Sequence, residues 1–104
     1  MKQILIDKFI VPENAFEEFT RRMNYNRSFI SKLQGFVNDA AYRRSDEEGN
    51  TVVVTVAVWE SEDAFTRAKH AVQAEYAKTG FNLPEVLSQL NIKAERGTYT
   101  EVTS

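Results

Sequence analysis

The sequence predicts an α+β protein in which one antiparallel sheet carries helices on one of its faces. Segments with strand and helix patterns follow one another in the order β-α-β-β-α-β, and a polar segment that ends in Gly-Asn separates the two middle strands, as in a β-hairpin. A chain of 104 residues with 42% hydrophobic and 27% charged positions suits a single domain over residues 1–104.

The first strand and the first helix are read from residues 3–35. Residues 3–11 are rich in Ile, Leu, Phe and Val and stop at Pro12, which favours a strand followed by a helix start. Apolar residues then recur at helical spacing: Phe16, Phe19, Met23, Ile30 and Leu33. Gly35 is the expected glycine C-cap. Asn26 falls on the same inward stripe, so its amide needs a hydrogen-bond partner.

The hairpin and the second helix occupy residues 36–80. Strands are predicted at 36–44 and 51–59, and Ser61 is expected to cap the next helix, which ends near Gly80. In the second strand Val52, Val54, Val56 and Val58 share one face, and Val53, Thr55, Ala57 and Trp59 share the other. The buried stripe of the helix is expected to hold Phe65, Ala68, Val72 and Tyr76. Both faces of this strand are therefore largely apolar.

A short helix over 82–90, with Pro84 in its first turn, and a last strand over 92–102 complete the chain. This order is the ferredoxin-like arrangement, and right-handed crossovers would place both long helices on one face of the sheet. The valines on the opposite face then need a cover. We therefore expect a homodimer formed by sheet-on-sheet packing.

Composition excludes several classes of function. The chain has no cysteine and one histidine, His70, which lies off the apolar stripe of its helix and is expected at the surface. Neither a metal site nor another bound cofactor is expected, because ligand clusters and a glycine-rich phosphate loop are missing. A net charge of -2 argues against nucleic-acid binding. The apolar runs are too short for a signal peptide or a membrane span, which favours a cytoplasmic protein.

A family resemblance rests on the junction between the hairpin and the second helix. The segment Val-Trp-Glu-Ser-Glu-Asp-Ala-Phe at 58–65, together with Pro12 and the Leu-Gln-Gly-Phe turn at 33–36, resembles the antibiotic biosynthesis monooxygenase family of dimeric α/β barrels. The haem-degrading members have an Asn, a second Trp and a His where this chain has Asp7, Ala68 and Lys78. The resemblance therefore does not imply haem binding here.

The quinone-forming members of that family, which need no cofactor, are similar to this chain at Trp59. They have an Asn four residues before this Trp and a Tyr six residues after it, where this chain has Thr55 and Phe65. The resemblance thus implies a monooxygenase for a small aromatic, phenol- or quinol-like substrate. It carries over Trp59 as the one shared site residue.

Asp7 is the main candidate for a catalytic group, because a carboxylate on a central strand is poorly solvated and needs either a partner or a function. As a general base it would deprotonate a phenol or enol; the alternative is an ion pair with Arg96 or another basic residue. Trp59 would form an aromatic wall, or serve the core alone. The remaining ligand-binding candidates are Asn26, Thr55, Phe65 and Tyr76.

Two functions follow from these candidates. The first is an oxygenase whose pocket, between the helices and the sheet, deprotonates and orients an electron-rich aromatic substrate. The second is a protein of the same dimeric fold that binds or senses a small aromatic molecule without catalysis. The sequence does not determine which face of the sheet Tyr42 and Tyr99 occupy.

Overall fold

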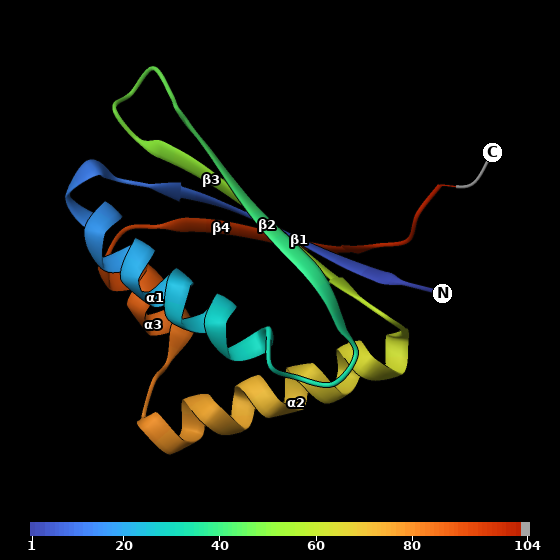
Figure 1. The fold of residues 1–104 in the computed structure, drawn as a ribbon. Coiled ribbons are helices and arrows are strands. Elements are labelled where there is room, and N and C mark those ends of the chain that lie inside the picture. The colour runs from blue at the N-terminus through green and yellow to red at the C-terminus, as the bar shows by residue number, and fades with distance from the viewer. Residues whose placement is uncertain (103–104) are drawn as a thin grey trace.

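Four strands form one antiparallel sheet in the order β2-β3-β1-β4 in the computed structural model, which describes residues 1–102. The elements are β1 (Gln3–Val11), the 3-10 turn η1 (Glu13–Ala15), α1 (Phe16–Ile30), β2 (Phe36–Ser45), β3 (Thr51–Trp59), α2 (Glu62–Thr79), α3 (Leu83–Gln89) and β4 (Lys93–Tyr99). All three α-helices lie on the same side of the sheet (Figure 1). This arrangement confirms the predicted ferredoxin-like α+β fold.

The helix caps explain where the second half of the chain changes direction. The hydroxyl of Ser61 accepts a hydrogen bond from the N–H of Ala64 at 3.1 Å, which makes it the predicted N-cap of α2. Gly80 ends α2 with φ +71°, also as predicted. β4 stops at Tyr99, earlier than the predicted 102, because Tyr99 pairs with Ile4 at the start of β1 and few partner residues remain beyond it.

Gly35 is not the C-cap of α1, which was the expected role. The helix ends at Ile30, and Ser31 is its cap. Gly35 lies in the turn before β2 with φ +87°, and its carbonyl accepts the N–H of Glu60 at 2.8 Å. A Cβ atom at this position would lie 2.4 Å from the Cβ of Ala64. The turn therefore needs glycine both for its backbone conformation and for the close approach of α2.

Replacing Gly35 by alanine should lower the free energy of unfolding by about 2–4 kcal/mol, since it combines an unfavourable positive φ with an overlap in the core. Gly49→Ala is the matched control. Gly49 has a similar φ, +84°, but nothing lies within 4 Å of a Cβ there. Urea unfolding of both variants separates the two costs; an equal loss in both would show that the overlap with Ala64 contributes nothing.

Two apolar clusters fill the space between the helices and the sheet. The first contains Val11, Ala15, Phe19, Val53 and Ile92. The second contains Ile30, Ala57, Trp59 and Ala68. The odd-numbered residues of β1 and β3 thus face the helices, because successive strand residues alternate between the two faces.

The opposite face of the sheet carries the even-numbered residues of β1 and β3. Its apolar members are Ile4, Ile6, Ile10, Val52, Val54, Val56 and Val58. The register places Tyr42 opposite Val54 and Tyr99 opposite Ile4, so both tyrosines belong to this face, and they are 64% and 51% exposed. We call this surface the open face, because no helix within residues 1–102 covers it (Figure 1).

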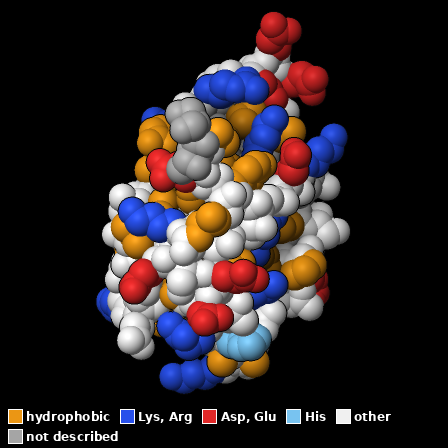
Figure 2. Space-filling view, turned by 90° about the vertical axis from the view of Figure 1, so that its right-hand side faces the viewer, with side chains coloured by type: hydrophobic (Ala, Val, Ile, Leu, Met, Phe, Trp, Pro, Cys, Tyr) orange, Lys and Arg blue, Asp and Glu red, His pale blue; other side chains and the backbone are white. Residues whose placement is uncertain are grey.

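The side of the molecule where β1 begins and β4 ends, at the right of Figure 1, is seen directly in Figure 2, where hydrophobic side chains are interspersed with charged ones. His70 is exposed on α2, as predicted from its place off the apolar stripe.

Candidate functional site

A band of polar side chains separates the two apolar clusters on the helix-facing side of the sheet. Asp7 and Thr55 are direct cross-strand neighbours in the middle of β1 and β3. Two residues away on one side Phe9 and Val53 belong to the first cluster, and on the other side Leu5 and Ala57 belong to the second. A polar residue at this point of a strand is not required for packing, so the band marks a candidate site.

Arg96 on β4 lies opposite Asp7 in the register and forms a two-point ion pair with it. Its Nε donates to Oδ1 of Asp7 at 2.7 Å, and its Nη2 donates to Oδ2 at 3.1 Å. This hydrogen bonding raises the pKa of Arg96 above its ordinary value. The ion pair that was the alternative reading of Asp7 is therefore present in the structure. The role of Asp7 as a base stays a prediction.

Two residues from the helices face this band. Tyr76 on α2 donates a long hydrogen bond of 3.5 Å from its hydroxyl to Oδ1 of Asn26 on α1. Burial is the main cause of the raised pKa of Tyr76, while the charge of Arg96 lowers this pKa and that of Asp7 raises it. Asn26 thus has the partner that its inward position required. The charges of Asp7 and Arg96 act on the hydroxyl of Tyr76.

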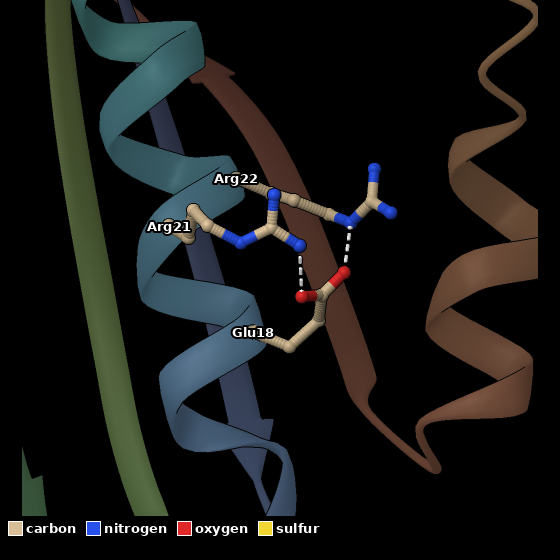
Figure 3. Close-up of polar contacts among 3 residues, drawn as sticks. All are labelled: Glu18, Arg21 and Arg22. Carbon is tan, nitrogen blue, oxygen red and sulfur yellow. Dashed lines mark hydrogen bonds and ion pairs between the residues drawn. The ribbon is translucent and has the colours of Figure 1, made fainter.

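A chain of contacts links α1 to the end of α2. Glu18 accepts hydrogen bonds from both Arg21 and Arg22, the latter at 2.7 Å (Figure 3). These bonds lower the pKa of Glu18. The guanidinium of Arg22 lies 4.7 Å from the ring centre of Phe81, which in turn packs edge-on against Tyr76 at 4.8 Å. The contacts join α1 to the end of α2 where Tyr76 lies.

Trp59 and Phe65 lie in the second apolar cluster, at the end of the sheet toward the start of α2. Trp59 is 2% exposed and packs edge-on against Phe36 at 5.5 Å between ring centres. Its indole N–H is buried and has no hydrogen-bond partner among the described residues. Trp59 therefore packs in the core, and its role as an aromatic wall for a ligand stays a prediction.

The structure thus brings together Asp7, Asn26 and Tyr76, with Thr55 beside Asp7, and it adds Arg96 as a full member of the group. Trp59 and Phe65 share the same face of the sheet but lie within the apolar cluster. That these residues line a single pocket stays a prediction. Two open surface hollows lie elsewhere, one lined by residues 44–48 of the hairpin and the other by Glu13, Asn14 and residues 48–50.

The described residues hold neither a cluster of metal-binding side chains nor a helix that could cross a membrane. Within residues 1–102 no three His, Asp or Glu side chains gather in a way that could hold a metal ion. None of the described helices combines the length and the hydropathy that a bilayer span requires.

Comparison with known proteins gives one family and several similar structures. The family model described as antibiotic biosynthesis monooxygenase matches residues 3–79. A mutant of SnoaB from Streptomyces nogalater, described as a cofactor-independent oxygenase, is 28% identical, with a TM-score of 0.70, over 99% of this chain and 95% of that chain. No curated protein matches the chain.

Two further structures show the same fold at lower identity. A conserved protein from Methanosarcina mazei Go1 is 16% identical, with a TM-score of 0.72, over 98% of this chain and 94% of that chain. A protein from an uncultured marine organism, described as dimeric and ferredoxin-like, is 12% identical, with a TM-score of 0.74, over 99% of this chain and 97% of that chain.

Proposed function

The chain belongs to the antibiotic biosynthesis monooxygenase family, and from this premise we propose that it is a monooxygenase that oxidises a small aromatic, phenol- or quinol-like substrate without a bound cofactor. The observation that carries the proposal is the 28% identity to a cofactor-independent oxygenase over 99% of the chain. The polar band beside an aromatic cluster supports it, because ligand pockets combine apolar walls with a few placed polar groups.

The proposed reaction needs no external reductant. In an anthrone-like substrate a ring CH₂ group and one O₂ become a ring carbonyl and one water. Loss of a first proton leaves an electron-rich enolate, whose carbon reduces O₂ and forms a C–O bond. The proton returns to the resulting peroxide, and water leaves as the O–O bond and the second C–H bond break.

Asp7 is the group proposed to take the first proton. Arg96 occupies one direction at each of its carboxylate oxygens, and each oxygen retains a second lone pair that can accept a proton from the substrate. Trp59 and Phe65 would supply the aromatic wall. Asn26, Thr55 and Tyr76 would supply the polar contacts that orient the substrate.

The test is oxygen uptake by the purified protein with a panel of hydroquinones and anthrones under air, with chromatography of the products. The proposal requires uptake above the spontaneous rate with at least one of them and the appearance of the matching quinone. Binding without uptake would favour the second candidate, a protein that binds or senses such molecules. That candidate is supported by the engagement of both oxygens of Asp7 with Arg96.

The proposal includes a homodimer that buries the open face. Valine and isoleucine side chains dominate this face on the two central strands, and a structure with the same fold is described as dimeric. An apolar sheet face of this kind is usually covered by another surface. A second copy provides a matching apolar face of the same shape.

Val56→Asp should convert the homodimer to a monomer, because it introduces an unpaired charge at the centre of the open face, between Ile6 and Ala40 in the register. Light scattering should give about twice 11.9 kDa for the natural sequence and 11.9 kDa for the variant. Gln73→Asp, which adds a charge at an exposed position of α2, should remain a dimer. A monomer mass for the natural sequence at every concentration would refute the homodimer.

A further inference from the structure

The ion pair of the polar band is markedly asymmetric, although its two hydrogen bonds are well formed. The side chain of Asp7 is 12% exposed, whereas that of Arg96 is 57% exposed. Asp7 lies on the central strand β1 and Arg96 on the edge strand β4, so the arginine compensates an enclosed carboxylate and still reaches water. Here the anion is enclosed, and more than half of the arginine side chain stays accessible.

Arg96 also has N–H donors that its bonds to Asp7 do not use. A guanidinium has five N–H donors in a planar fork, and the bonds recorded for Arg96 within residues 1–102 use two of its nitrogens, both toward Asp7. Because Asp7 holds Nε and Nη2, the orientation of the plane is fixed before any ligand arrives. A preorientated fork of this kind suits a second oxygen anion, with little further loss of side-chain freedom.

The surroundings favour an aromatic anion over a small hydrated one. Arg96 lies on the helix-facing side of the sheet, where the polar band is bordered by two apolar clusters. The hydroxyl of Tyr76, whose pKa the charge of Arg96 lowers, donates its hydrogen to Asn26 and can still accept a hydrogen bond. Apolar clusters on either side of the polar band favour a ligand with a flat apolar body and a single ionised oxygen.

We infer that Arg96 is the anion-binding group of this site and pairs with the ionised oxygen of a phenol- or enol-type ligand, while Asp7 positions its guanidinium and receives the proton that the ligand loses. In this step the ligand O–H bond breaks and an O–H bond forms on Asp7, while the N–H donors of Arg96 that Asp7 does not hold pair with the ligand oxygen, so the total charge of the site is unchanged. The inference rests on the substrate class of the proposed function. It adds the group that recognises this class.

The probe is 4-nitrophenol, a phenol that ionises near neutral pH and absorbs visible light only as its phenolate. At a pH slightly below its own pKa, binding to the protein should increase the phenolate absorbance. The methyl ether 4-nitroanisole, which cannot ionise, should bind more weakly. Fluorescence of Trp59, the one tryptophan of the chain, gives both affinities without any reaction.

Two variants should act in opposite directions. Arg96→Gln should weaken binding of the phenolate about ten- to hundredfold and abolish the increase in its absorbance, because a charge-assisted hydrogen bond is lost. Asp7→Asn should strengthen phenolate binding, because Arg96 then has no competing anion. A pair that is only structural would make both variants lose affinity together, and that result would overturn the inference.

Controls separate loss of the site from loss of the fold. Arg27→Gln breaks a comparable ion pair, that of Arg27 Nε with Oδ2 of Asp39 at 2.6 Å, on the same face of the sheet but outside the polar band, and should leave probe binding unchanged. Arg96→Lys keeps the charge without the planar fork, and should retain part of the phenolate preference. Equal binding of 4-nitrophenol and 4-nitroanisole by the natural sequence would by itself overturn the inference.

The outcome for this inference is independent of the outcome for catalysis, because 4-nitrophenol binding involves no oxygen. Arg96-dependent phenolate binding without oxygen uptake from any hydroquinone or anthrone would sustain the inference and overturn the oxygenase. Oxygen uptake combined with undiminished phenolate binding in Arg96→Gln would support the oxygenase and overturn the inference on Arg96.

Discussion

Asp7→Asn should lower the rate of oxygen uptake with an active hydroquinone or anthrone by about 10²- to 10⁴-fold, the range expected when a general base is removed. The physical reason is that the amide cannot take up the substrate proton, although it has nearly the same shape as the carboxylate. The amide oxygen can still accept one hydrogen bond from Arg96, so the fold should persist. Initial rates from an oxygen electrode, at saturating substrate, measure the effect.

The same variant should bind 4-nitrophenolate at least as well as the natural sequence, so its loss of turnover cannot be attributed to lost binding. Arg27→Gln is again the matched control, because the Arg27–Asp39 pair links α1 to β2 without entering the polar band. Its rate should match that of the natural sequence. Equal rates in Asp7→Asn and the natural sequence would rule out Asp7 as the base.

Trp59→Ala should lower the free energy of unfolding by about 3–5 kcal/mol, the cost of truncating a large buried aromatic side chain. Trp59 is 2% exposed, and it fills the second apolar cluster against Phe36. Urea unfolding followed by far-ultraviolet circular dichroism gives the loss, at a single protein concentration, because the stability of a dimer depends on concentration. Ligand binding should weaken along with stability, since one side chain serves both.

Trp59→Phe is the informative control. Phenylalanine keeps an aromatic ring for the contact with Phe36, and the lost indole N–H has no partner among the described residues, so the loss of stability should be clearly smaller than for alanine. A reduction in ligand affinity in Trp59→Phe, out of proportion to its small loss of stability, would identify that N–H as a ligand contact. A loss below about 1 kcal/mol in Trp59→Ala would contradict the core role.

The sequence by itself determined the element order and the two faces of the central strands. The spacing of apolar residues identified β1 and β3 with their observed bounds, and Ser61 and Gly80 identified the ends of α2, because strand alternation and helix caps are local properties. The same local patterns placed Asp7, Asn26 and Tyr76 on the inward side. The segment at 58–65 identified the family, which the family model confirms over residues 3–79.

Only the tertiary structure decided how these groups meet. Gly35 is the residue type that often ends a helix, yet its role is set by contact with Ala64, a residue far away along the chain. Arg96 is separated from Asp7 by 89 positions, and strand pairing alone brings the two together as a two-point ion pair. Tyr76 and Asn26 meet across two helices. Sequence patterns report local periodicity, whereas strand register and helix packing fix which charges become neighbours and how far each remains exposed.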